Sequence, residues 1–328
     1  MSYRHVLPRQ LGLIACCLVL AACSEQGEPT APVSDAPPAM DTLVSAQWLS
    51  EHLGEEDLVV LDCTVLVEQG EDGGFQIKNG RPNFEAGHIP TAGFADLMGE
   101  LADPESTLEF AVPTPEQFAA AMGALGVGND SRVVLYDAYN SAWAARVWWM
   151  LRWIGFDRAA ILDGGLNAWK AGDRPLSTEP AERAPQRLAI NLRPGLIADR
   201  AEVLAAVADD SVQIVDSLPA GHYRGEWAMY ERPGHITSAV NVPTTVTMDE
   251  SGRFLSEAQL EALFEGDRGT RNITYCGGGI AAASNAFLMT RLGFEDVAIY
   301  AASLQEWTVD PELPMSTATE FDEFDGQE

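Results

Sequence analysis

The chain has few cations, histidines and cysteines for its length. Its 328 residues contain 20 Lys and Arg against 49 Asp and Glu, a formal net charge of −29. Such an acidic chain has no surplus of cations to replace the counterions of phosphate, so we exclude nucleic acid as a partner. Five histidines and five cysteines show no close spacing of metal ligands and no disulfide framework. The composition is otherwise that of a globular protein long enough for two cores.

The N-terminus has no apolar run long enough for a comfortable membrane span. Arg4 and Arg9 precede the apolar residues 11–22, the pattern of a secretion signal. Residues 20–23, Leu-Ala-Ala-Cys, resemble the lipobox of bacterial lipoproteins. The resemblance implies removal of residues 1–22 and a lipid on Cys23. Because Ser24 follows it, we expect a periplasm-facing protein anchored in the outer membrane; an ordinary cleaved signal, releasing a soluble periplasmic protein, is the alternative.

Proline and small or polar residues dominate residues 23–40, which we interpret as a disordered tether. Cys16 and Cys17 would leave with the signal, and Cys23 would carry lipid. Cys63 and Cys276 then remain in the folded part. In an oxidising compartment these two could form a single disulfide.

Cys276 ends a strand-like run and stands before three consecutive glycines and a helix-forming run. Glycine can turn sharply and point successive N–H groups inward, and the following helix adds the positive end of its dipole. A thiolate in such a place has a lowered pKa and is a nucleophile at neutral pH. The alternative is a small buried hydrophobe. We predict that Cys276 is a nucleophile in a cradle of backbone N–H groups from Gly277, Gly278, Gly279, Ile280 and Ala281.

The folded part repeats one pattern of strand, helix, strand and closing segment. In the first copy these are residues 132–137, 142–154, 159–163 and 164–169. In the second copy they are residues 272–276, 281–292, 296–300 and 303–307. Strands that alternate with amphipathic helices imply βαβ units around a mainly parallel sheet. We therefore predict an α/β fold with two tandem domains.

Four prolines without clear periodicity mark a linker between the two copies, at residues 175–194. The predicted organisation is a first domain at 41–174, the linker, a second domain at 195–316 and an acidic tail at 317–328.

With this pattern the chain resembles the two-domain rhodanese family of sulfurtransferases over residues 42–315. The resemblance rests on residues 144–152, 162–169, the Gly-His-Ile segments at 87–89 and 234–236, and the Cys276 loop. It implies that Cys276 takes a sulfane sulfur from a donor as a persulfide and passes it to a thiophilic acceptor such as cyanide or a thiol. A persulfide is anionic and needs hydrogen-bond donors, which the cradle would supply. We expect a monomer without cofactor or metal, whose partners are these small molecules and, through the lipid, a membrane.

Asp137 occupies the position in the first half that corresponds to Cys276. Because a carboxylate cannot carry a sulfane sulfur, we expect the first domain to be silent and to form the other wall of the cleft. His88 and His235 are expected to hold loops. The tryptophans expected to pack the helix and the face between the domains are Trp143, Trp148, Trp149 and Trp153.

The resemblance leaves the sulfur donor open. Thiosulfate enzymes of this family typically follow the cysteine with two basic residues, and mercaptopyruvate enzymes with glycine, a small residue such as serine, and glycine. Here Gly278 replaces that serine and no cations follow. Phe110 stands where the mercaptopyruvate subgroup tends to have a histidine, although Asp96 matches an acidic residue of that subgroup. We expect thiosulfate as the donor, with 3-mercaptopyruvate as the alternative.

Two arginines are expected to bind the donor. Arg224 matches a family arginine that holds the donor anion, and Arg232 could stand in for a second one or be a solvated surface residue. Ala301 and Ala302 replace the Asp-Gly pair that the first half keeps at Asp163.

Two other classes of function remain for comparison. A cysteine phosphatase would need an arginine late in the loop, but residues 281–283 are all alanine. A rhodanese-like binding module without activity is the more serious alternative, although such a module has no need of Cys276 and its glycines.

Overall fold

The computed structural model describes residues 40–69, 75–179 and 181–317. The expected signal, Cys23, the tether up to residue 39 and the acidic tail beyond residue 317 lie outside these residues.

The first half is built on a parallel sheet with the strand order β1-β7-β6-β2-β5. Its strands are β1 (Leu43–Val44), β2 (Leu58–Asp62), β5 (Ala92–Phe94), β6 (Arg132–Tyr136) and β7 (Ala159–Leu162), with an antiparallel pair β3 (Val65–Gln69) and β4 (Phe75–Asn79). Its helices are α1 (Ala46–His52), α2 (Arg81–Ala86), α3 (Pro115–Ala124), α4 (Ala142–Trp153) and α5 (Gly165–Ala171).

The second half has a parallel sheet with the corresponding order β11-β9-β12-β13-β8. Its strands are β8 (Ile197–Ala198), β9 (Val212–Asp216), β11 (Val240–Asn241), β12 (Arg271–Tyr275) and β13 (Asp296–Tyr300), with an antiparallel pair β10 (His235–Ile236) and β14 (Met315–Ser316). Its helices are α6 (Arg200–Ala206), α7 (Ala220–Tyr223), α8 (Glu257–Glu261), α9 (Ile280–Arg291) and α10 (Ser303–Trp307), with 3₁₀ turns η1 (Pro194–Leu196) and η2 (Thr244–Val246). The predicted tandem α/β fold is confirmed.

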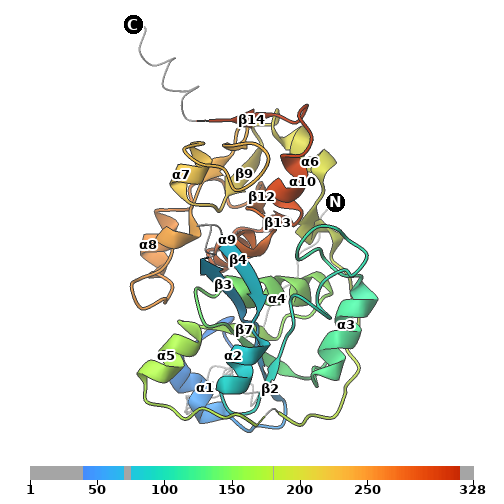
Figure 1. Ribbon diagram of the computed structural model, residues 1–328, viewed down its shortest axis with the longest axis vertical. Coiled ribbons are helices and arrows are strands. Elements are labelled where there is room, and N and C mark those ends of the chain that lie inside the picture. Colours follow the sequence, from blue (N-terminus) through green and yellow to red (C-terminus); the bar gives the residue numbers. More distant parts are fainter. Residues whose placement is uncertain (1–39, 70–74, 180, 318–328) are drawn as a thin grey trace, which may run out of the picture. The chain divides into compact units, whose positions relative to one another are not determined.

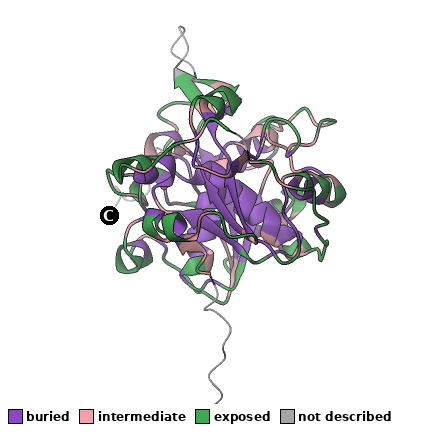
Figure 2. Ribbon diagram, turned by 90° about the horizontal axis from the view of Figure 1, so that it is seen from below, coloured by how far each residue is buried: buried purple, intermediate pink, exposed green. Residues whose placement is uncertain are grey.

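The long helices of the two halves, α4 and α9, pack against each other and lie side by side in Figure 1. Trp148 of α4 meets Phe287 of α9 edge to face, with ring centroids 4.9 Å apart. Trp149 donates from its ring N–H to Leu196 O of the second half at 3.2 Å. Figure 2 shows the buried strands and helices at the centre of the fold. Burial of each large apolar side chain stabilises the fold by roughly 1.5–3 kcal/mol. Of the four tryptophans expected to pack there, Trp148 and Trp149 join the two halves, whereas Trp143 packs on Phe110 of the first half.

The two Gly-His-Ile segments hold corresponding loops. His88 stacks on Phe84 and its Nδ1 lies 2.7 Å from Phe84 O. His235 stacks on Tyr223 and its Nδ1 lies 2.7 Å from Tyr223 O. The structural role expected for both histidines is therefore confirmed.

Among the described residues, no helix combines the length and the apolar character that a membrane crossing requires.

Candidate functional site

Cys276 lies where the central strand of the second half turns into a helix. β12 ends at Tyr275, and α9 begins at Ile280. Between them, Gly279 has φ +81°, a conformation that other residues adopt only with strain. This turn lets the Gly279 N–H donate to Cys276 Sγ at 3.1 Å. The thiol is only 3% exposed, so the loop holds a buried sulfur at a helix N-terminus.

The carbonyl groups of the loop have partners elsewhere. Cys276 O accepts from Leu304 N–H at 3.2 Å, and Gly277 O accepts from Gln305 N–H at 3.1 Å. Gly279 O accepts from Nη1 of Arg146 at 3.4 Å. The N-terminus of α10 and one first-half arginine thus bind the oxygens that would repel an anion. At the thiol itself, Gly279 is the one member of the predicted cradle among the described residues that donates to the sulfur.

Each glycine of the loop is in contact with a different neighbour. A Cβ on Gly277 would collide with the Tyr230 hydroxyl, and one on Gly278 with the Gln305 amide nitrogen. A Cβ on Gly279 would lie 2.7 Å from Ala301 O. The loop therefore needs three glycines because side chains and backbone cover it closely.

The first half takes part in this cover. Glu109 N–H donates to Gln305 Oε1 at 2.9 Å, and Gln305 Nε2 donates to Glu109 O at 3.4 Å. Gln305 thus lies over Gly278 while it bridges the two halves. The space that a serine at position 278 would need is filled by this amide. The first half forms a wall of the site, as the sequence predicts.

His222 lies in α7 and Arg224 is the C-cap residue of that helix, but the two side chains differ in their contacts. Arg224 is exposed, and its Nε donates to Glu226 Oε1 at 2.6 Å. His222 is fully buried, and neither ring nitrogen has a hydrogen-bond partner. Its ring meets Trp227 and Tyr230 edge to face, at centroid distances of 5.2 and 6.2 Å. Burial lowers the pKa of His222. Tyr230 in turn covers Gly277, so the ring of Tyr230 lies between His222 and the cysteine loop.

The prediction that Arg232 binds the donor is corrected by the structure. Its guanidinium donates to four carbonyl oxygens at 2.8–3.0 Å, those of Trp307, Thr308, Asp310 and Leu313. A planar fork that is bound in this way stabilises the segment after α10 and uses four of its five N–H donors there.

Asp96 belongs to a network within the first half. Its carboxylate accepts from Asn79 Nδ2 at 2.8 and 2.9 Å and lies 3.7 Å from Nη2 of Arg81. Among the described residues, these contacts do not bring it to the Cys276 loop.

Asp137 occupies the corresponding loop of the first half, between β6 and α4. Its two carboxylate oxygens accept from four backbone N–H groups at 2.8–3.1 Å, those of Tyr139, Ser141, Trp143 and Ala144. Burial raises the pKa of Asp137, and these bonds act in the opposite direction. The first-half loop therefore surrounds the carboxyl group of Asp137 with backbone N–H donors.

Cys63 and Cys276 are both free thiols, so the disulfide that the sequence left open is absent. Cys63 follows β2 and is fully buried, and burial raises the pKa of its thiol well above the ordinary value. It is therefore a neutral core residue.

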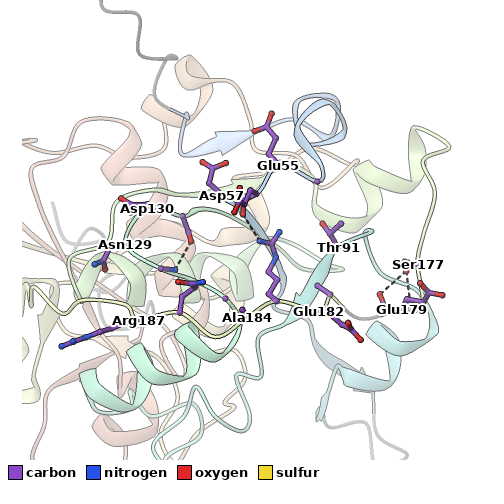
Figure 3. Close-up of a pocket in the computed structure, with 18 residues that line it drawn as sticks. Glu55, Asp57, Thr91, Asn129, Asp130, Ser177, Glu179, Glu182, Ala184 and Arg187 are labelled. Atoms are coloured by element: carbon purple, nitrogen blue, oxygen red, sulfur yellow. Dashed lines mark hydrogen bonds between the residues drawn. The ribbon is translucent and has the colours of Figure 1, made fainter.

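A cavity of about 870 Å³ lies away from the Cys276 loop, on the first half and the linker. Figure 3 shows Glu55, Asp57 and Asp130 on one side of it and Glu182 and Arg187 on the linker side. Among the described residues, no group of three or more His, Cys, Asp or Glu side chains could hold a metal ion.

His222, Tyr230, Gln305 and Arg146 were not predicted from the sequence as site residues. His222 stands in the same tetrapeptide, residues 222–225, as Arg224. The sequence therefore indicated this segment but singled out the arginine and not the histidine. The other three reach the loop from distant segments, and a single sequence carries no sign of such contacts.

Comparison with known proteins matches the Rhodanese-like domain to residues 45–172 and 199–310. The chain is 32% identical to the 3-mercaptopyruvate sulfurtransferase of Escherichia coli K12 over 283 residues, 83% of this chain and 96% of that protein. It is 32% identical to the thiosulfate sulfurtransferase of Gallus gallus over 275 residues, 81% of this chain and 92% of that protein. The crystal structure of the 3-mercaptopyruvate sulfotransferase SseA from Escherichia coli superposes with a TM-score of 0.72 at 32% identity, covering 80% of this chain and 99% of that one. The chain therefore belongs to the rhodanese family of sulfurtransferases.

Proposed function

We propose that the chain moves a sulfane sulfur from a small anionic donor to cyanide or a thiol through a persulfide on Cys276. The observation that supports this most is the buried Cys276 sulfur, which accepts from Gly279 N–H in a loop whose carbonyls are bound elsewhere. Backbone donors placed in this way stabilise a negative sulfur without any proton transfer.

The first half-reaction forms one sulfur–sulfur bond. With 3-mercaptopyruvate, the Cys276 thiolate attacks the donor sulfur and the donor carbon–sulfur bond breaks. The electron pair moves to the carbon, which takes the proton of the donor thiol, and pyruvate leaves. With thiosulfate, the sulfur–sulfur bond of the donor breaks and sulfite leaves with the electron pair. In either case Cys276 carries an anionic persulfide.

The second half-reaction regenerates the thiolate. Cyanide attacks the outer sulfur of the persulfide, the sulfur–sulfur bond breaks, and thiocyanate leaves. The Cys276 sulfur keeps the electron pair and is again an anion. The loop therefore has to stabilise one negative charge throughout the cycle, which suits fixed backbone donors.

For the donor, we propose 3-mercaptopyruvate first and thiosulfate second. The loop from Gly277 to Ala281 carries no cationic side chain, which favours a donor with one charge over a dianion. The 3-mercaptopyruvate relative supports this order. The thiosulfate relative from Gallus gallus supports the second donor, which the sequence alone favours.

We further propose that His222 contacts the donor. Two ring nitrogens without partners next to Tyr230 leave a hydrogen bond to be made when a donor arrives. Arg224, the C-cap residue of the same helix, whose Nε is bound to Glu226, is the matched comparison. His222→Phe should raise the KM for the donor about tenfold, as loss of one hydrogen bond to an anion would. Arg224→Met should change it less; the reverse order would restore Arg224 as the donor-binding residue.

The place of the reaction is also a proposal. Residues 20–23 support a lipid on Cys23 and a periplasm-facing position at the outer membrane. Metabolic labelling with a radioactive fatty acid tests this. Label that is lost in Cys23→Ala supports the anchor, and an unlabelled wild-type chain contradicts it.

The test of the function is thiocyanate formation by the purified chain with cyanide as acceptor. 3-Mercaptopyruvate and thiosulfate are supplied in parallel, and the two kcat/KM values are compared. Turnover with either donor supports the sulfurtransferase, and the larger kcat/KM identifies the donor. A folded chain with reduced Cys276 and no turnover would support the binding module instead.

A further inference from the structure

The first half places one cation under the catalytic loop of the second. Arg146 lies in α4 and is 1% exposed. Its Nη1 donates to Gly279 O at 3.4 Å, and its Nη2 donates to Phe110 O at 2.7 Å. The guanidinium also lies 5.2 Å from the ring centroid of Trp149. One side chain of the silent half thus touches the residue whose N–H donates to the Cys276 sulfur.

No carboxylate accompanies this cation. Among the described residues Arg146 forms no ion pair, and its Nε has no hydrogen-bond partner. A buried charge without an opposite charge is strongly destabilising, so buried cations are normally paired. Burial lowers the pKa of Arg146 to about 10, and the charge of the nearby Cys276 sulfur acts in the opposite direction. The arginine therefore stays charged at neutral pH.

The helix α9 of the second half does not offer a matching cation to the Asp137 loop of the first half. Arg146 is the fifth residue of α4, and the fifth residue of α9 is Ser284. Ser284 is fully buried, and its hydroxyl has no hydrogen-bond partner. The Cys276 loop thus receives a guanidinium from the opposite helix, whereas the corresponding position of α9 carries a small neutral side chain. The arginine thus occurs opposite the loop that holds the cysteine and not opposite the loop that holds Asp137.

We propose that Arg146 is the counter-cation of the sulfur anion on Cys276 and the positioning residue of its cradle. The inference deepens the proposed function, because it assigns the charge that such a sulfur carrier needs. No proton moves in this role. Nη1 holds the Gly279 carbonyl, so the N–H of the same residue stays directed at the sulfur. The positive charge offsets first the thiolate and then the persulfide, which carry the same charge.

The other groups around the sulfur are few. Tyr230 and Gln305 cover the loop, and the Ser303 hydroxyl accepts from Cys276 N–H at 3.1 Å. Glu109, which is exposed, adds its charge near Tyr230. Burial, the charge of the Cys276 sulfur and that of Glu109 raise the pKa of Tyr230, so the phenol stays neutral. Among these groups Arg146 is therefore the cation that contacts the Cys276 loop, at Gly279 O.

The test measures the reactivity of Cys276 and not turnover. The full chain is alkylated with iodoacetamide between about pH 5 and 10, and the Cys276 peptide is followed by mass spectrometry because other cysteines also react. Arg146→Met should move the midpoint of the rate against pH upward by about 1–3 units, the usual effect of a close opposite charge. Arg146→Lys should move it less, because the ammonium keeps the charge but cannot bridge two carbonyls as the fork does.

Arg152→Met is the matched control. Arg152 lies on the same helix, with its guanidinium 5.0 Å from the Trp148 ring centroid and 3.7 Å from Asp157. It does not touch the Cys276 loop, so its variant should keep the wild-type midpoint. An unchanged midpoint in folded Arg146→Met would overturn the proposal. Because alkylation needs no donor, a missing persulfide in the wild type would refute the proposed function without affecting this result.

A second measurement leaves Arg146 in place, in case Arg146→Met does not fold. Cys276→Ser removes the anion and leaves the buried cation alone. A thiolate that is stabilised in the folded state adds stability above the ordinary thiol range, and this stability is lost as the pH falls. The free energy of unfolding of the wild type should thus rise relative to Cys276→Ser as the pH rises towards about 8.5, the ordinary thiol value. A difference that stays flat over this range would overturn the proposal.

Discussion

The loops after β6 and β12 both place a side chain with an acidic group against backbone N–H donors. Asp137 receives four backbone N–H groups, whereas the Cys276 sulfur receives one N–H together with the nearby charge of Arg146. Both loops stand at the end of a central strand and at the start of a twelve-residue helix. The fold thus builds a place for a negative group twice, and the side chain at that place decides the chemistry.

The largest expected effect comes from removing the sulfur. Cys276→Ser should reduce thiocyanate formation by at least about 10³-fold, because serine cannot hold a sulfane sulfur and nucleophile losses are of this size or larger. The fold should remain, as circular dichroism can check. Cys63→Ala is the control, since this buried neutral thiol is outside the loop. Turnover close to wild type in Cys276→Ser, or a complete loss in Cys63→Ala, would contradict the account.

The silent loop should matter for stability and not for chemistry. Asp137→Ala leaves four N–H groups without an acceptor, so the free energy of unfolding should fall by about 2–4 kcal/mol. Asp137→Asn keeps one oxygen and should cost less. Urea denaturation measures both variants, and the turnover of the folded fraction should stay close to wild type. If Asp137→Ala lost turnover while keeping its stability, the first loop would have a direct part in the reaction.

Asp216, at the end of β9, makes the stability of the second half depend on pH. Tyr275 donates to its carboxylate at 2.6 Å, and burial raises the pKa of Asp216 to about 6. The folded state binds the proton of Asp216 more tightly than the unfolded state does. The stabilisation that this gives to the folded state is therefore complete below about pH 4 and is lost as the pH rises through 6. Between these values the wild type should lose roughly 2 kcal/mol relative to Asp216→Asn. Parallel curves of unfolding free energy against pH would contradict this.

The smallest effect is expected at Gly278. Gly278→Ser would displace the Gln305 amide and its bridge to Glu109, and turnover should fall about tenfold, which corresponds to about 1.4 kcal/mol. Gln305→Ala should lose less, and the double variant should recover part of the loss because the two side chains compete for one space. Additive losses in the double variant would show that Gln305 and position 278 act independently.

Much of this comparison can be predicted from the sequence. The repeat of strand, helix, strand and closing segment predicted the two sheets, and the cysteine before three glycines indicated the loop. These signals are local, and hydrophobic periodicity and backbone freedom suffice to recognise them.

The contacts between segments were not predictable in this way. Arg232 and Arg224 look alike in one sequence, yet the first binds four carbonyls and the second an exposed carboxylate. Arg146 stands in a helix of apolar residues, and its contact with Gly279 exists only because α4 and α9 pack together. Such roles depend on the packing of the two halves, which a motif does not encode.

The most direct test of the account is the mass of the Cys276 peptide after the chain has been incubated with 3-mercaptopyruvate or thiosulfate without an acceptor. The account predicts one added sulfur atom on Cys276 that disappears when cyanide is added, with thiocyanate formed in equal amount. A sulfur found on Cys63 instead, or thiocyanate formed while Cys276 never carries sulfur, would contradict it.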